Sequence, residues 1–91
     1  MELKDAREEI NRIDTEMAEL FVRRMHAAAE IAAYKREHGL PIEDKEQETR
    51  VIEAHSNLIE DEALRPLYVR FLQGTMDVSK LWQQHLLGED G

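Results

Sequence analysis

Apolar residues recur at every third or fourth position through the first third of the chain, which is the spacing of one face of an α-helix. At the centre of this face, where the next apolar residue is due, the chain has Arg24. The pattern therefore predicts one long amphipathic helix with a guanidinium inside its apolar stripe. The stripe consists of Leu3, Ala6, Ile10, Ile13, Met17, Leu20, Ala27, Ile31 and Tyr34.

This first helix is predicted to run without interruption from about Leu3 to Glu37. It has no internal Gly or Pro, whereas Gly39 and Pro41 follow closely and are typical of a helix end. A helix of this length spans roughly 50 Å. A compact domain of this size has a radius of gyration near ~12 Å, so one chain does not easily cover such a stripe. We therefore expect a homodimer in which the long helices pack together.

Two shorter helices are predicted after the first. One covers about residues 44–58, with Val51 and Ile52 on its apolar side. The other begins near residue 62 or 64 and reaches about residue 87, with Pro66 tolerated in its first turn. The sequence thus predicts an all-α fold with three helices. The buried stripe of the third helix is expected to consist of Leu67, Tyr68, Phe71, Leu72, Thr75, Ser79, Trp82, Gln83 and Leu86.

Every predicted helix also carries polar residues on its apolar face. Lys35 lies eleven residues after Arg24, and steps of about 100° return it to nearly the same face. Glu48 lies on the apolar side of the second helix, and Ser79 and Gln83 interrupt the stripe of the third. Taken singly, such residues are often structural, because buried polar groups are usually paired. Taken together, the two cations need a counter-ion, which Glu48 or an anionic ligand would supply.

Arg7 is a third cation on the first helix, 17 residues before Arg24. The two are about 25 Å apart along the helix axis, too far to serve one small site within a subunit. On spacing alone, Arg7 is expected to pair at the surface with neighbours such as Glu8 or Glu2. In an antiparallel or crossed dimer, Arg7 of one chain would instead reach the pocket of the other.

Composition narrows the functional classes. The 91 residues, 42% hydrophobic and 35% charged, predict one folded domain over residues 1–91. A net charge of −8 argues against general binding to nucleic acid or anionic membranes, and no apolar run approaches the roughly 20 residues of a membrane span. The N-terminus is too charged for a signal peptide, so we expect a cytoplasmic protein. The sequence contains no Cys, phosphate-binding glycine loop, metal-ligand spacing or nucleophile triad.

Four segments together resemble the all-helical class of chorismate mutases over nearly the full chain. AREEINRID matches the opening of the family, and LFVRRMHAAAEIAAYK matches its pattern of Arg, a small-residue helix face and Lys. GLPIEDKEQE matches the loop before the second helix, and DVSKLWQQ matches the third helix with Ser and Gln four apart. Each segment is weak alone, but their order and spacing are fairly specific.

The resemblance implies an intertwined homodimer with three helices per subunit and two shared active sites. It also implies the Claisen rearrangement of chorismate to prephenate, a step toward phenylalanine and tyrosine, without a cofactor. The substrate is a dianion, and the reaction has no nucleophile and no proton transfer. Catalysis would therefore come from holding the substrate and from electrostatic preorganisation.

Roles for particular residues follow from the same resemblance. Arg24, and Arg7 of the partner subunit, would hold the substrate carboxylates, with Ser79 beside one of them. Lys35 and Gln83 would donate hydrogen bonds to the ether oxygen whose bond to carbon breaks.

The second helix departs from the family pattern at one position. Glu48 would accept a hydrogen bond from the ring hydroxyl of the substrate, helped by the backbone at Asp44. The family usually has Arg just before this Glu, whereas this chain has Gln47. We expect weaker substrate binding as a result, with the reaction retained.

Two alternatives remain open from the sequence. Isochorismate-pyruvate lyase shares the fold and much of the site, although Glu48 and the DKEQE context look more like a mutase. A non-catalytic helical dimerisation module would have the same long helix. Such a module should lose the inward-facing polar groups that this chain retains, and turnover separates the two.

Overall fold

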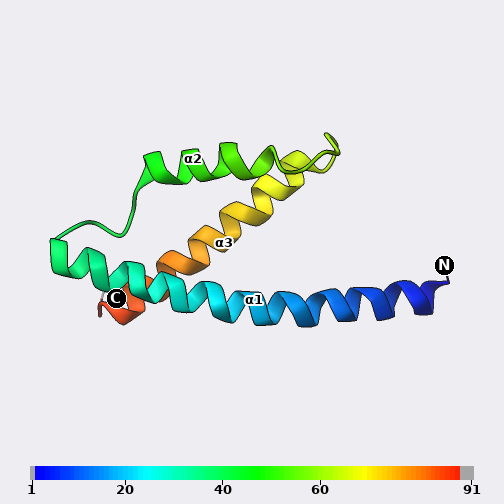
Figure 1. Ribbon diagram of the computed structural model, residues 1–91, viewed down its shortest axis with the longest axis horizontal. Coiled ribbons are helices and arrows are strands. Elements are labelled where there is room, and N and C mark those ends of the chain that lie inside the picture. Colours follow the sequence, from blue (N-terminus) through cyan, green and yellow to red (C-terminus); the bar gives the residue numbers. More distant parts are fainter. Residues whose placement is uncertain (1, 89–91) are drawn as a thin grey trace.

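Three α-helices make up the computed structural model, which describes residues 2–88. They are α1 (Leu3–His38), α2 (Lys45–Ser56) and α3 (Arg65–Leu86), and no strand occurs within the described residues (Figure 1). The predicted all-α fold with one long N-terminal helix is confirmed. The predicted domain of residues 1–91 extends beyond the described residues at both ends.

Local signals in the sequence set the helix ends. α1 starts at a capping box in which the Glu2 backbone N–H donates to the Asp5 carboxylate at 3.3 Å. It ends at Gly39, whose φ of 62° lies in the left-handed region that Gly adopts without steric cost. The Asp44 carboxylate caps α2 by accepting from the Gln47 backbone N–H at 3.0 Å. α2 therefore begins one residue later than predicted.

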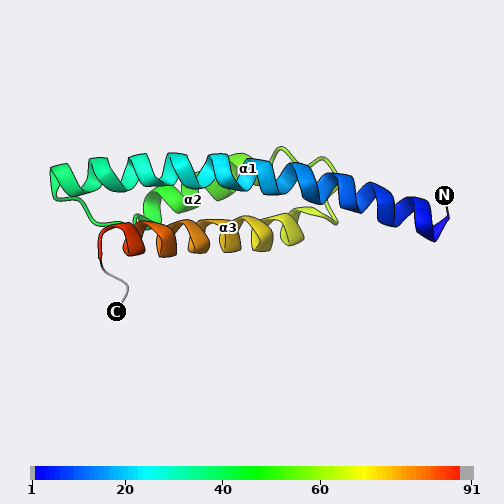
Figure 2. The ribbon, with the colours of Figure 1, turned by 90° about the horizontal axis from the view of Figure 1, so that it is seen from below.

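The helix α3 is the central element of the fold. Both views show that it runs in the same direction as α1 (Figures 1 and 2), and Figure 1 shows that it crosses the C-terminal half of that helix. At the crossing, Ala28 and Ala32 are 5% and 1% exposed, and these small residues allow a close approach of the two helices. The Gln83 amide donates to the Ala28 carbonyl oxygen at 3.0 Å. α2 packs on α3 and makes no direct packing contact with α1 within the described residues.

A single chain leaves an unusually large apolar surface uncovered. Its total solvent-accessible surface is 7317 Å², whereas a compact monomer of this mass has a total of about 5,500 Å². The radius of gyration is 16.1 Å, above the ~12 Å of a compact domain. Figure 2 shows the N-terminal part of α1 extending past the other two helices. Its large exposed apolar residues are Leu3, Ile10, Ile13, Met17, Leu20, Phe21 and Val22.

The predicted stripe of α3 is only partly buried within one chain. Leu72, Ser79 and Gln83 are buried as expected. The prediction is wrong for Leu67 and Phe71, which are 56% and 54% exposed, because α1 diverges from the first turns of α3. It is also wrong for Leu86, which is 39% exposed near the end of the helix. Met76, which is not among the predicted residues, is buried. The buried face of α3 therefore follows residues 72, 76, 79 and 83.

Candidate active site

Arg24 lies at the middle of α1 and turns toward α3. Its Nη1 atom donates to Ser79 Oγ and to the Thr75 carbonyl oxygen, the latter at 3.5 Å. The Ser79 hydroxyl in turn donates to the same carbonyl at 3.1 Å. The other N–H groups of the guanidinium make no hydrogen bond to a described residue, so most of its five donors remain available. The arginine is accommodated in the apolar stripe because α3 offers it two acceptors, the Ser79 hydroxyl and the Thr75 carbonyl oxygen.

Gln83 lies at the contact between α3 and α1, and Lys35 lies nearer the end of α1, beside the loop before α2. The half-buried Lys35 ammonium donates to the Ile42 carbonyl oxygen at 2.7 Å, which ties the end of α1 to the loop before α2. Gln83, only 6% exposed, uses one amide hydrogen on the carbonyl of Ala28. An ammonium has three donors and an amide has two. Each side chain is therefore fixed by one bond to the backbone and keeps at least one further donor.

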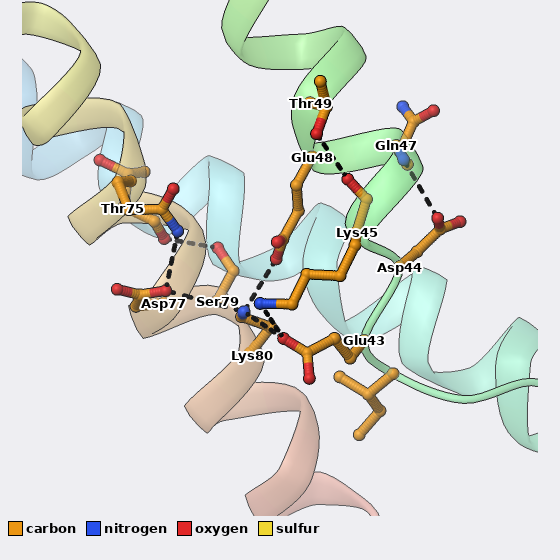
Figure 3. A network of polar contacts seen from close by, with 12 residues as sticks. Glu43, Asp44, Lys45, Gln47, Glu48, Thr49, Thr75, Asp77, Ser79 and Lys80 are labelled. Carbon is orange, nitrogen blue, oxygen red and sulfur yellow. Dashed lines mark hydrogen bonds and ion pairs between the residues drawn. The ribbon is translucent and has the colours of Figure 1, made fainter.

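The Glu48 carboxylate meets a lysine of α3 that the sequence analysis did not single out. Lys80 Nζ lies 2.8 Å from Glu48 Oε1, 3.1 Å from Glu43 Oε1 and 3.7 Å from Asp77 Oδ1 (Figure 3). The Lys80 and Glu48 side chains are 20% and 15% exposed. We refer to Glu43, Glu48, Asp77 and Lys80 as the Lys80 cluster. The expectation that Glu48 would neutralise Arg24 or Lys35 is wrong, because Glu48 pairs with Lys80.

Two pKa values in the Lys80 cluster move in the directions that ion pairing dictates. The hydrogen bond to Glu48, with a smaller one to Glu43, raises the pKa of Lys80 above its usual 10.5 although partial burial opposes the shift. The pKa of the Glu43 carboxyl is lowered, first by its hydrogen bond with Lys45 and then by that with Lys80. Lys80 is therefore a cation, and Glu43 an anion, throughout the neutral range.

The ion pairs of Lys80 give stability a defined dependence on pH. A Lys80→Met variant is expected to be less stable than the parent by about 1 kcal/mol at pH 7. Because the folded-state pKa of Lys80 is raised, this contribution is complete below the usual value of 10.5 and is lost as pH rises through the folded-state pKa. Urea unfolding of both proteins at equal concentration, from pH 7 into alkali, measures the difference. A difference that persists unchanged at the alkaline end would contradict this account.

Gln47 faces away from the Lys80 cluster. Its side-chain oxygen accepts from Arg50 Nε at 3.2 Å and from Arg50 Nη2 at 3.1 Å. In Figure 3 it lies beside Asp44, on the opposite side of the first turn of α2 from the Glu48 carboxylate. Gln47 and Asp44 are both exposed. Of the predicted residues on α2, Glu48 therefore lies closest to α3.

Arg7 does not join the other candidate residues within one chain. It lies on the exposed N-terminal part of α1. The other two predicted site residues of this helix, Arg24 and Lys35, lie in its middle and near its end. The expected surface pair with Glu8 or Glu2 is wrong: within residues 2–88 Arg7 makes no ion pair, and Glu8 is 3.9 Å from Lys4 instead. Arg7 is thus a cation on the exposed part of α1 without an ion-pair partner among the described residues of its own chain.

An apolar groove of about 660 Å³ opens beside Arg24, between α1 and the first half of α3. Arg24, Thr75 and Ser79 form the polar part on one side, and Arg70 is a second cation that lines the groove. The other residues that line it are Met17, Leu20, Phe21, Met25, Phe71, Gly74 and Val78. The polar site therefore continues directly into uncovered apolar surface.

The arrangement presents hydrogen-bond donors and positive charge, which suit the binding of a small anion. Arg24 and Lys35 present cationic donors from α1, and Gln83 presents a neutral donor from α3. The described residues contain no group of His, Asp and Glu side chains that would hold a metal ion. Within residues 2–88, no helix has both the length and the hydrophobicity needed to cross a lipid bilayer.

Comparison with known proteins identifies the family. The chorismate mutase type II family matches residues 6–84. The T-protein of Haemophilus influenzae is 38% identical over 52 residues, which make up 57% of this chain and 14% of that protein. The chain thus corresponds to only a small part of that relative's length, and no solved structure gives a significant match. The family match covers most of the sequence and includes Arg24, Lys35, Glu48, Ser79 and Gln83, so this chain belongs to the chorismate mutase type II family.

Proposed function

We propose that this chain is a chorismate mutase, which converts chorismate to prephenate by a Claisen rearrangement. The observation that carries the proposal is the set of donors beside the α1–α3 contact. Arg24, Lys35 and Gln83 are each anchored by a hydrogen bond to the protein and each retain unused donors. A rigid array of donors with no nucleophile suits a reaction in which the substrate only has to be held and polarised.

Substrate binding would depend on the arginines. Chorismate carries two carboxylates, and a guanidinium fork matches a carboxylate in shape and charge. Arg24 would bind one of them with the donors that α3 leaves free. Ser79 would lie beside the same carboxylate, since its hydroxyl already accepts from Arg24.

Rate enhancement would come from the donors at the ether oxygen. Negative charge grows on this oxygen as its bond to carbon lengthens. Lys35 and Gln83 would donate to it, and an interaction that strengthens in the transition state accelerates the step rather than only improving binding. Their bonds to Ile42 and Ala28 support this role, because positioned donors need no reorganisation during the reaction.

The residues of α2 would orient the ring. Glu48 would accept a hydrogen bond from the ring hydroxyl, with help from the backbone at Asp44. Gln47 would lie at the edge of the site.

We further propose that the active form is a homodimer in which Arg7 enters the site of the partner subunit. The uncovered stripe of α1, the apolar groove beside Arg24 and the excess exposed surface all support a second chain as the missing cover. Arg7 has no ion-pair partner among the described residues of its own chain, which leaves it available to a second carboxylate.

A dimer predicts a mass of about twice 10.6 kDa in sedimentation equilibrium. Because the apolar face of α1 would be buried between subunits, an Ile13→Lys substitution is expected to lower the stability of the dimer by several kcal/mol, about the cost of burying an unpaired charge. Glu16→Lys, on an exposed position outside the stripe, serves as the control. A parent that sediments as a monomer at micromolar concentration would contradict the dimer.

Restoring a cation next to Glu48 should improve substrate binding. A Gln47→Arg substitution is expected to lower KM several-fold with little change in kcat, because it adds attraction for a dianion and leaves the donors at the ether oxygen unchanged. Steady-state kinetics at low ionic strength measures both constants. Thr49→Arg adds the same charge elsewhere on α2 and should have a smaller effect. An unchanged KM in Gln47→Arg would show that Gln47 does not limit binding.

Incubation of the purified protein with chorismate tests the proposed function. Consumption of chorismate with prephenate as the product is expected. Release of pyruvate from isochorismate, without rearrangement of chorismate, would replace the mutase with a lyase. A folded protein that turns over neither compound would overturn the proposal.

A further inference from the structure

Lys80 connects three separate parts of the chain at the candidate site. Its ammonium, on α3, lies 2.8 Å from Glu48 on α2 and 3.1 Å from Glu43 in the loop before α2. Asp77, one turn earlier on α3, lies 3.7 Å away. These contacts set how closely the first turn of α2 approaches α3. They therefore also set where the Glu48 carboxylate lies.

The position of Lys80 in the sequence ties this cluster to Arg24. Lys80 directly follows Ser79, whose hydroxyl accepts from the Arg24 guanidinium. Figure 3 shows the Ser79 and Lys80 side chains leaving adjacent positions of α3, with Glu48 reaching down from α2 toward Lys80. One short stretch of α3 thus fixes both the arginine of α1 and the glutamate of α2.

Only one oxygen of Glu48 is engaged by Lys80. Oε1 accepts from the ammonium, whereas Oε2 makes no hydrogen bond to any residue in the described part of the chain. A carboxylate held in this way is restrained by one contact and keeps acceptor capacity on its other oxygen. Neighbouring Gln47 cannot fix it, because its side chain is bonded to Arg50 on the other side of the helix.

Charge balance gives Lys80 a second effect. A half-buried carboxylate next to a dianionic substrate repels that substrate strongly, because charges in a partly desolvated site are weakly screened. The ammonium of Lys80 offsets the charge of Glu48 at 2.8 Å. The remaining carboxylates of the cluster, Glu43 and Asp77, are 54% and 56% exposed and are better screened by water.

We propose that Lys80 is a positioning residue of the active site, which orients and neutralises Glu48 so that its free oxygen accepts the ring hydroxyl of the substrate. This inference rests on the proposed function. It assigns Lys80 no contact with the reacting atoms. Loss of Lys80 should therefore affect substrate binding more than the chemical step.

Steady-state kinetics of matched variants tests the role. Lys80→Met is expected to raise KM about tenfold or more, the effect of one unbalanced charge pair, while kcat changes less. Lys80→Arg keeps the cation and should recover most of the affinity. Lys45→Met removes another cation that contacts Glu43 but is 77% exposed, and should leave KM nearly unchanged. Circular dichroism at the assay temperature confirms that each variant is folded.

A double variant separates positioning from a merely structural role. If the unbalanced charge of Glu48 causes the defect, adding Glu48→Gln to Lys80→Met should lower KM again, whereas a structural defect would persist. Lys80→Gln replaces Lys80→Met if the latter does not fold. An active parent whose Lys80 variants behave like Lys45→Met, or show no recovery in the double variant, overturns this inference alone. A parent that neither binds nor converts chorismate overturns the proposed function, and this inference with it.

Discussion

Replacing Lys35 with Met is expected to lower kcat about 100- to 1,000-fold, the usual cost of removing one preorganised donor to a developing oxyanion. In the proposed mechanism the ammonium acts where negative charge grows on the ether oxygen. Its bond to the Ile42 carbonyl at 2.7 Å holds it in place before the substrate arrives. KM should change much less than kcat, because the interaction is stronger in the transition state than in the bound substrate.

Single-turnover kinetics with excess enzyme isolates the chemical step for this comparison. Lys45→Met, which removes a solvent-exposed ammonium of α2, is the matched control and should keep nearly full activity. If Lys35→Met retained kcat within tenfold of the parent, Lys35 could not be the donor to the breaking bond. Gln83 would then be the first candidate for that role.

Replacing Arg24 with Ala is expected to lower kcat/KM about 100-fold or more, since charge-assisted hydrogen bonds of a guanidinium to a carboxylate contribute roughly 1.5–3 kcal/mol each. Two effects combine in this variant. The substrate loses a carboxylate ligand, and the buried Ser79 hydroxyl loses the donor it accepts from. Both KM and kcat should worsen, because a loosely held substrate also spends less time in the reactive conformation.

Arg23→Ala provides the matched control for this variant. Arg23 is the neighbouring residue on α1 but is exposed, so its removal should change kcat/KM only slightly. Unfolding measurements on both variants show whether lost packing accounts for the loss. Equal activities of the Arg23 and Arg24 variants would exclude Arg24 as a substrate ligand.

The helices of this protein follow closely from local features of the sequence. Apolar residues that recur every three or four positions, with no Gly or Pro among them, predict α1. Gly39 ends this helix with a positive φ that other residues rarely adopt. Pro66 occupies the first turn of α3 as expected. The inward direction of Arg24, Ser79 and Gln83 also follows from helical spacing, because helix faces are set by periodicity alone.

The Lys80 cluster did not follow from spacing, because it depends on how the helices pack. Glu43 and Lys80 are 37 residues apart, and they meet only because the loop before α2 passes the side of α3. One sequence signal did exist: Lys80 lies three residues from both Asp77 and Gln83, so it borders the polar side of α3. The exposure of Leu67 and Phe71 in the predicted stripe of α3 could not be predicted from spacing for the same reason. Whether these side chains are buried depends on how other helices pack against α3.

Subunit mixing tests most directly the central claim that chorismate is rearranged in a site shared by two chains. Arg7→Ala and Arg24→Ala homodimers should each form almost no prephenate. A heterodimer of the two has one site with both substitutions and one intact site. Random reassociation of the two chains should therefore restore about a quarter of the parent activity, since about half of the dimers are mixed. A mixture no more active than the separate variants, beside an active parent, would contradict the shared site.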